Sequence, residues 1–232
     1  MRRGDTAKVA AGRRNTLLVG LELVVLIAGP VLLMGLPVQL LRFATIFLVA
    51  GYAFWRLWAN GVAGTYLRFN WQGCRAALPG ILLRWLIGSA AILAVVLAIS
   101  PERAFCIPRA EPMLMAVIVS FYGLVSVLPQ EIAFRGYAAW RLDGTRLPFW
   151  AGCLISAALF GWVHILFGSM LSVVLSGIAG LSFYRTYRKY RSLAAVWLEH
   201  SLLGISVFAL GLDYLFYVGP TSPAIAAVCG AP

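Results

Sequence analysis

The sequence carries very little charge. Of its 232 residues only 12% are charged and 62% are hydrophobic, whereas a soluble domain has roughly 25% charged and 45–50% apolar residues. So few polar side chains cannot cover a water-facing surface, and the mean hydropathy of +0.88 agrees. The composition therefore excludes a soluble globular domain and indicates a protein of the lipid bilayer.

Acidic residues, histidines and paired cysteines are also scarce. The chain has eight acidic residues against nineteen basic ones, for a net charge of +11, and two histidines. Its four cysteines, Cys74, Cys106, Cys153 and Cys229, form no C-x-x-C pair and no Cys/His cluster. We therefore expect isolated cysteines and no structural zinc site. No A-x-A cleavage site follows the first apolar run, which we interpret as an uncleaved first span.

Long apolar stretches predict an all-α fold, a polytopic membrane helical bundle of about seven transmembrane helices, since each span needs about 20 apolar residues. We expect one membrane domain, residues 1–232. The stretches lie near 17–38, 43–59, 81–99, 113–129, 148–166, 169–184 and 193–211.

The basic residues predict the orientation of this bundle. They gather in the N-terminal tail and in the second, fourth and sixth loops, while the loops between carry little net positive charge. With seven alternating spans these segments all lie on one side, so the positive-inside rule places the N-terminus in the cytoplasm. We expect a multi-pass protein of the bacterial cytoplasmic membrane. The basic excess then reflects orientation, and we expect no nucleic-acid partner.

A few ionisable residues lie inside the predicted spans. Each costs roughly 2.5–3.5 kcal/mol in a bilayer, so such residues usually face a cavity or a partner and indicate function. Both histidines of the chain are among them. The set is Glu22, Arg84, Glu131, Arg135, His164, Glu199 and His200.

Spacing suggests how some of these residues meet. Glu131 and Arg135 are four apart, so they are neighbours on one helix face, either as part of a catalytic site or as a structural ion pair. Phe160 and His164 have the same spacing, and small residues in 156–161 would let a neighbouring helix approach closely. Glu199 points about 100° away from His200 around the helix, so we expect it to pair with an arginine such as Arg135 or to cap the helix.

Three kinds of chemistry could use this set of residues. A carboxylate could act as general base on a water while the imidazoles orient it and stabilise an oxyanion, which suits peptide hydrolysis. Two histidines and a glutamate could instead bind Zn²⁺, although H-E-x-x-H is absent. A proton relay in a transporter is the third possibility.

Three motifs resemble those of a known family. The segments PQEIAFRGY (129–137), FGWVH (160–164) and WLEHSLLG (197–204) are similar, in order and spacing, to E-E-x-x-x-R, F-x-x-x-H and a later His in the CAAX prenyl protease and bacteriocin-processing (CPBP or Abi) family of intramembrane proteases. The resemblance implies a catalytic core at 113–211 and a cavity open to the cytoplasm. It also implies that Glu131, Arg135, His164 and His200 are the site residues.

The sequence departs from the family pattern at two positions. The first glutamate of the doublet is Gln130, so Glu131 must act in its place. The asparagine expected after the last histidine is missing, and Gly204 stands four residues on. Oxyanion support would then come from Ser201 or from His200 itself.

We therefore predict an intramembrane endopeptidase in which Glu131 activates a water. His164 and His200 position the water and stabilise the intermediate, and Arg135 orients Glu131. Gln130, Phe160 and Ser201 are supporting residues. We expect no cofactor, with zinc as the alternative, and a peptide or protein substrate that could be lipid-modified. The alternative is a non-catalytic scaffold or bacteriocin-immunity protein, and a proton-coupled transporter is the third reading.

Overall fold

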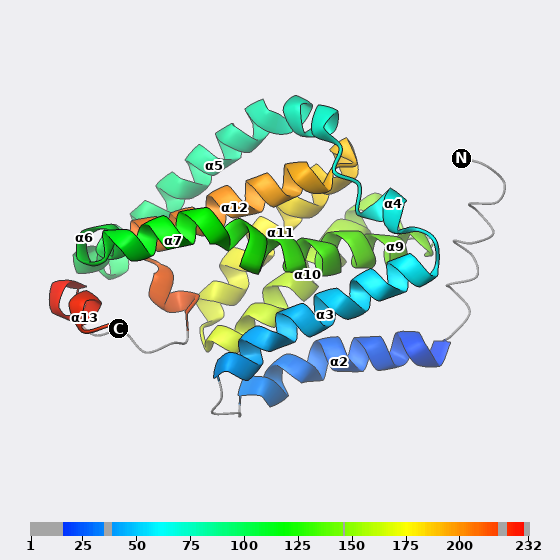
Figure 1. The fold of residues 1–232 in the computed structure, drawn as a ribbon, viewed down its shortest axis with the longest axis horizontal. Helices are drawn as coiled ribbons and strands as arrows, with labels where there is room; N and C mark the ends of the chain where they lie inside the picture. Colours follow the sequence, from blue (N-terminus) through cyan, green and yellow to red (C-terminus); the bar gives the residue numbers. More distant parts are fainter. Residues whose placement is uncertain (1–15, 35–38, 146, 218–221, 230–232) are drawn as a thin grey trace.

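The computed structural model describes residues 16–34, 39–145, 147–217 and 222–229 (Figure 1). Within these ranges the chain forms helices joined by turns and contains no strand, which confirms the all-helical fold class. The long helical segments are α2 (Thr16–Met34), α3 (Gln39–Ala59), α5 (Trp71–Ile99), α10 (Phe149–Val163), α11 (Met170–Tyr190), α12 (Leu193–Leu210) and a rod that runs from Pro112 to Asp143.

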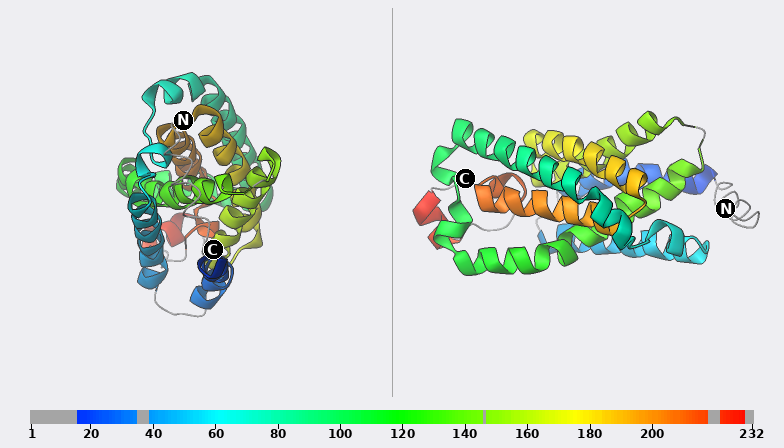
Figure 2. Two further views of the ribbon diagram at one scale, coloured as in Figure 1. Left: turned by 90° about the vertical axis from the view of Figure 1, so that its right-hand side faces the viewer. Right: turned by 90° about the horizontal axis from the view of Figure 1, so that it is seen from above.

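Short elements lie between the long helices and after the last of them. They are α4 (Ala63–Tyr66), η1 (Pro101–Arg103), α6 (Cys106–Ala110), η4 (His164–Phe167), η5 (Asp213–Leu215) and α13 (Pro223–Cys229). Most of the long helices run roughly along the long axis of an elongated bundle, with α6 and α13 toward one end and α4 and α9 toward the other (Figures 1 and 2).

Four segments of the described chain are long and apolar enough to cross a membrane. They are Ala63–Ile99, Pro112–Asp143, Phe149–Phe167 and Leu193–Leu210, and two shorter apolar helices cover Val24–Met34 and Ala44–Ala59. A multi-pass membrane protein is thus confirmed, but the expected count of seven spans is not. The sixth predicted span lies in α11, whose several serines and basic C-terminal turns lower its hydropathy.

The rod between Pro112 and Asp143 carries the first motif. It consists of α7 (Pro112–Tyr122), α8 (Leu128–Glu131) and α9 (Ala138–Asp143), joined by two π-helical segments, η2 (Gly123–Val127) and η3 (Ile132–Tyr137). A π turn holds more residues than an α turn and so shifts which side chains face a neighbour, and such turns are frequent at functional sites. The short α8 between them presents Gln130 and Glu131.

One end of the bundle is tied together by helix caps. The Asn70 side chain accepts a hydrogen bond from Gly73 N (3.1 Å) at the start of α5 and donates one to Tyr190 O (3.2 Å) at the end of α11. Ser192 caps α12 by accepting from Ala195 N (3.1 Å), and its hydroxyl donates to Asn70 O (2.8 Å). These caps satisfy backbone groups that a helix end leaves free, and they fix the start of α12 on which the last motif lies.

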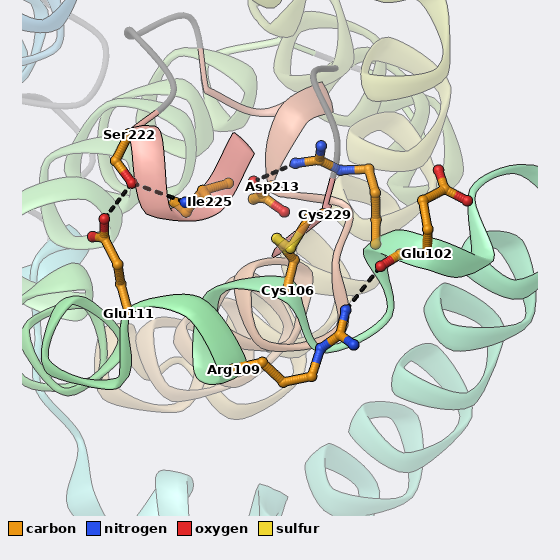
Figure 3. Close-up of a disulfide and its surroundings, with 9 residues drawn as sticks. Glu102, Cys106, Arg109, Glu111, Asp213, Ser222, Ile225 and Cys229 are labelled. Atoms are coloured by element: carbon orange, nitrogen blue, oxygen red, sulfur yellow. Dashed lines mark hydrogen bonds and ion pairs between the residues drawn. A yellow bond between two sulfur atoms is a disulfide. The ribbon is translucent and has the colours of Figure 1, made fainter. Parts of the chain in front are cut away.

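The opposite end is held by a disulfide between Cys106 of α6 and Cys229 of α13 (Figure 3). Our expectation of isolated cysteines is wrong for this pair. The two residues are 123 positions apart, and only the folded chain brings their Cα atoms to 5.9 Å. An ion pair of 3.2 Å between Arg103 and Asp213 lies at the same end. Burial raises the pKa of Asp213, and the Arg103 guanidinium opposes this rise.

Helices α10 and α11 pack very closely, as the small residues of α10 predict. A Cβ atom added at Gly161 would lie 2.7 Å from the carbonyl oxygen of Val173 and 3.1 Å from the Cα of Gly177. Any larger side chain at Gly161 would push the two backbones apart. This close contact fixes the turn of α10 that carries Phe160 and, one turn later, His164.

Candidate active site

Glu131 lies at the centre of the candidate site and is fully buried. One carboxylate oxygen, Oε1, is 2.7 Å from Nδ1 of His200 on α12. The other, Oε2, is 3.3 Å from Nε of Arg135, one turn further along its own rod. The structure therefore joins three of the four predicted site residues through one carboxylate, and the spacing of Glu131 and Arg135 correctly predicts their ion pair.

Arg135 reaches Glu131 from an aromatic pocket. Its side chain is fully buried, and its Cζ lies 4.2 Å from the ring centroid of Phe160 and 5.2 Å from that of Phe183. Cation–π attraction in such a desolvated place contributes about 2 kcal/mol. Its Nη1 and Nη2 atoms have no hydrogen-bond partner among the described residues. The ring faces and the Glu131 carboxylate thus stabilise the guanidinium charge.

Both histidines pack against Phe160. The ring centroid of Phe160 is 4.7 Å from that of His164 and 5.4 Å from that of His200. Phe183 of α11 stacks on the His200 ring, with centroids 4.7 Å apart. Phe160, which we predicted as a supporting residue, therefore contacts both imidazoles and the Arg135 guanidinium.

The hydrogen bonds of the two histidines define their free nitrogen atoms. His164 Nδ1 lies 2.6 Å from the backbone oxygen of Phe160, and a carbonyl oxygen only accepts, so Nδ1 carries the proton. His200 Nδ1 donates in the same way to the Glu131 carboxylate. In each neutral ring Nε2 is then the nitrogen with a free lone pair, which can accept a proton from a water or coordinate a metal.

A cavity of about 1240 Å³ lies beside these residues. Its wall is mostly apolar and is built by side chains of α2, α3, α5, α7, α10, α11 and α12. Both histidines line it, and so does Gln130, whose amide donates to the Ser126 backbone oxygen (3.0 Å) and hydroxyl (3.2 Å). Glu131 is not among the lining residues. It stands behind His200, so the imidazole and not the carboxylate meets the cavity.

Ser201 does not take part in this cavity. It is buried, it is not a lining residue, and its hydroxyl has no hydrogen-bond partner in the described part of the chain. A Cβ atom added at Gly123 would lie 2.9 Å from the Ser201 hydroxyl oxygen, so Ser201 faces the rod. The α12 residue that lines the cavity one turn after His200 is Gly204.

Glu199 pairs with an arginine, as expected, but the partner is Arg84 and not Arg135, which we gave as the example. Its carboxylate is 2.6 Å from Nε of Arg84 on α5, not bonded to Arg135, and it also accepts a 2.6 Å hydrogen bond from Ser182 on α11. The sequence contained both charges, but no spacing rule relates residues 115 positions apart. This pair joins three helices next to the site and leaves Glu131 as the carboxylate that contacts a histidine.

Tyr122 and Phe183 line the same cavity as the candidate site residues, and the sequence interpretation named neither. Tyr122, Ser126 and Gln130 follow one another at intervals of four and all line the cavity, so helical spacing from Gln130 was a usable signal for Tyr122. Phe183 has no comparable signal, because it belongs to a separate helix and only the packing of α11 places it against His200.

The two histidines are the residues of the cavity wall that could ligate zinc. The described residues contain no group of three or more His, Cys, Asp and Glu side chains placed to hold a metal ion. His164 and His200 would provide two ligands, while catalytic zinc sites normally use three protein ligands. Gln130 also lines the cavity, but an amide is a poor ligand for zinc.

The fold and the site define a helical membrane protein in which a glutamate, an arginine and two histidines gather beside a cavity between the helices. The family model described as "Rce1-like: Type II CAAX prenyl endopeptidase Rce1-like" matches residues 112–206. This match supports the resemblance seen in the three motifs: residues 112–206 are similar to the type II CAAX prenyl endopeptidases, a family of proteases. Comparisons with curated proteins and with solved structures gave no match.

Proposed function

We propose that the chain is an intramembrane endopeptidase of the CAAX-protease type, in which Glu131 activates a water through His200. The single observation that carries this proposal is the 2.7 Å bond from His200 Nδ1 to the fully buried Glu131 carboxylate. A carboxylate in this position fixes the tautomer of the imidazole and stabilises the imidazolium that forms when Nε2 takes a proton. Residues 113–211 form the proposed catalytic core of one membrane domain, 1–232.

The reaction can be written with groups that this chain provides. His200 Nε2 accepts a proton from a water while the water oxygen bonds to the carbonyl carbon of the scissile peptide. The carbonyl electron pair moves onto oxygen and gives a tetrahedral oxyanion. When the oxyanion collapses, the C–N bond breaks and the leaving nitrogen takes the proton from His200. Glu131 stays ionised throughout, and Arg135 holds its second oxygen.

His164 has a distinct part in the proposal. Its Nδ1 proton is held by the Phe160 carbonyl, so its Nε2 can accept a hydrogen bond from the same water and aim the oxygen lone pair at the carbonyl. The shared contact of both histidines with Phe160 supports this arrangement. A water that donates both of its protons to the two imidazoles has a fixed orientation, and its lone pairs point away from the rings.

The cavity supports a substrate that comes from the lipid phase. Its wall is mostly apolar, which disfavours a charged, fully hydrated peptide and favours a membrane-embedded or lipid-modified peptide or protein. A cavity of about 1240 Å³ is also larger than the roughly 300–1,000 Å³ of a typical small-molecule site.

Hydrolysis of a membrane-associated peptide by purified protein in lipid nanodiscs tests the proposal. Glu131→Gln should lower kcat at least ~100-fold, because an amide cannot stabilise the imidazolium. Glu102→Gln, a change of the same kind at an exposed residue, should leave kcat unaltered and is the matched control. Full activity of Glu131→Gln would refute the assignment, and loss of activity with a chelator, restored by Zn²⁺, would replace the glutamate mechanism by a metal one.

A second function, a non-catalytic scaffold or immunity protein, is favoured by one observation. The residue of the doublet that lines the cavity is Gln130 and not Glu131, so no carboxylate contacts the cavity directly. This alternative predicts that the wild-type protein hydrolyses no peptide and that Glu131→Gln retains its effect on the host cell.

We also propose that the arginine-rich end of the bundle lies in the cytoplasm of a bacterial cell. The disulfide at the opposite end supports this orientation, because disulfides persist in oxidising compartments such as the periplasm. Alkaline phosphatase fused after the last residue should therefore be active, whereas fusion after Ala59 should give an inactive enzyme.

A further inference from the structure

Hydrolysis of a peptide bond needs a donor for the oxygen that becomes negatively charged. One such donor typically contributes about 10²–10³-fold to kcat. The obvious donors of the site are already engaged. The Nδ1 protons of His164 and His200 bond to Phe160 and Glu131, and the Gln130 amide donates to Ser126. A different side chain must therefore point a proton into the cavity.

Tyr122 lies over Gly204 in an unusually close contact. A Cβ atom added at Gly204 would lie 2.3 Å from the Tyr122 hydroxyl oxygen and 2.3 Å from its Cε1. The tyrosine thus fills the space that a side chain at position 204 would take. Phe208 holds the ring from the next turn of α12, with centroids 5.5 Å apart in an edge-on arrangement.

This contact places the hydroxyl near His200. Gly204 follows His200 by four residues on α12, so the two positions share one face about 5–6 Å apart. Tyr122, His200 and Gly204 all line the same cavity. The Tyr122 hydroxyl therefore lies about one helical turn from the imidazole that activates the water.

Ser126 lies between Tyr122 and Gln130 on the cavity wall, four residues from each. Gln130 donates to the hydroxyl oxygen of Ser126 (3.2 Å). Because this oxygen already receives one hydrogen bond, the Ser126 proton can turn toward the phenol oxygen. Tyr122 then has its own O–H proton left to donate into the cavity.

We propose that the Tyr122 hydroxyl donates a hydrogen bond to the substrate carbonyl oxygen and stabilises the oxyanion, in the space that Gly204 leaves open. This inference rests on the proposed endopeptidase function. Of the two donors expected from the sequence, Ser201 faces away from the cavity, and the Nδ1 proton of His200 is bonded to Glu131. Tyr122 lies on the cavity wall and contacts Gly204 of α12.

Tyr122→Phe is the first test, because it removes the hydroxyl and keeps the ring that packs on Gly204. We expect kcat to fall about 100-fold with KM changed less than about twofold, since the bond strengthens only in the transition state. Tyr214→Phe removes a tyrosine hydroxyl that lies outside the cavity wall and should leave kcat unaltered. Full kcat in Tyr122→Phe would overturn the inference.

A side-chain swap separates the donor from a packing role. Tyr122→Ala should lose activity, and adding Gly204→Asn places an amide donor in the space that the ring leaves. We expect the double variant to recover at least ~10-fold in kcat over Tyr122→Ala. No recovery in a double variant that melts at the wild-type temperature would refute the donor role.

The two proposals fail in different ways. If wild-type protein hydrolyses the peptide and Glu131→Gln does not, an unaltered kcat in Tyr122→Phe overturns only the role of Tyr122. If wild-type protein and Glu131→Gln both fail to hydrolyse any peptide, the endopeptidase function is overturned and the role of Tyr122 with it.

Discussion

The buried pair of Glu131 and Arg135 makes a quantitative prediction. Neither side chain is exposed to solvent, so removing one partner leaves the other as an uncompensated buried charge. Arg135→Met keeps an apolar side chain between Phe160 and Phe183 but deletes the guanidinium. Breaking a buried pair in this way costs about 3–5 kcal/mol of unfolding free energy, and Glu131→Gln should cost a similar amount.

The double variant should be much less harmful than the sum of the single ones. Glu131→Gln with Arg135→Met removes both charges together, and the carbonyl oxygen of the substituted amide can still accept the His200 proton. The remaining loss is the cation–π attraction, about 2 kcal/mol. The two single changes together would cost about 6–10 kcal/mol if they were independent, so we expect a coupling of at least about 4 kcal/mol.

Reversible unfolding in mixed micelles with increasing dodecyl sulfate, followed by circular dichroism, measures these free energies. Arg188→Met is the matched control, since the side chains of Arg188 and Asp143 are 30% and 31% exposed and their pair should contribute less than about 1 kcal/mol. An additive double variant, or an Arg135→Met variant no less stable than the control, would refute the reasoning.

Three further predictions concern the packing and the two ends of the bundle. Gly161→Val should lower the melting temperature by pushing α10 away from α11. Gly64→Ala is the control, because a Cβ atom at this position meets nothing within 4 Å, and it should leave the melting temperature unaltered. Equal melting temperatures of the two variants would contradict the close contact. Reductant should destabilise the wild type by about 2–5 kcal/mol and leave a Cys106→Ala/Cys229→Ala variant unaltered. The raised pKa of Asp213 means that this group stabilises the fold fully below the ordinary value of 3.8 and loses that contribution as the pH rises through its folded pKa. Asp213→Asn should therefore show a smaller fall in melting temperature between about pH 4 and pH 7, and an identical pH profile would disprove this role.

Much of the site was predictable because local helical geometry places residues four apart on one face. This rule correctly paired Glu131 with Arg135 and placed His164 one turn after Phe160. The small residues of α10 likewise predicted its close approach to α11. These predictions depend on contacts within one helix or on the shape of one helix face, so the order of residues is enough to make them.

The errors arose where partners come from distant parts of the chain. Glu199 bonds to Arg84 and not to Arg135, because α5 and not the rod lies against that face of α12. Cys106 and Cys229 form a disulfide across 123 residues. The sequence spacing within these two pairs follows no helical or motif rule. Only the packing of the helices brings the two members of each pair together.

By itself, the sequence determined that this protein is helical and that it belongs in a membrane, and it selected a glutamate, an arginine and two histidines as the candidate site. Composition and helical periodicity suffice for that, because the bilayer tolerates few charges and those present must have partners. Only the tertiary structure decided that Glu131 lies behind His200, that Gln130 faces the cavity and that Tyr122 fills the space above Gly204. The burial of a side chain and the direction of its hydrogen bonds depend on which helices pack against it, and that packing involves the whole chain at once.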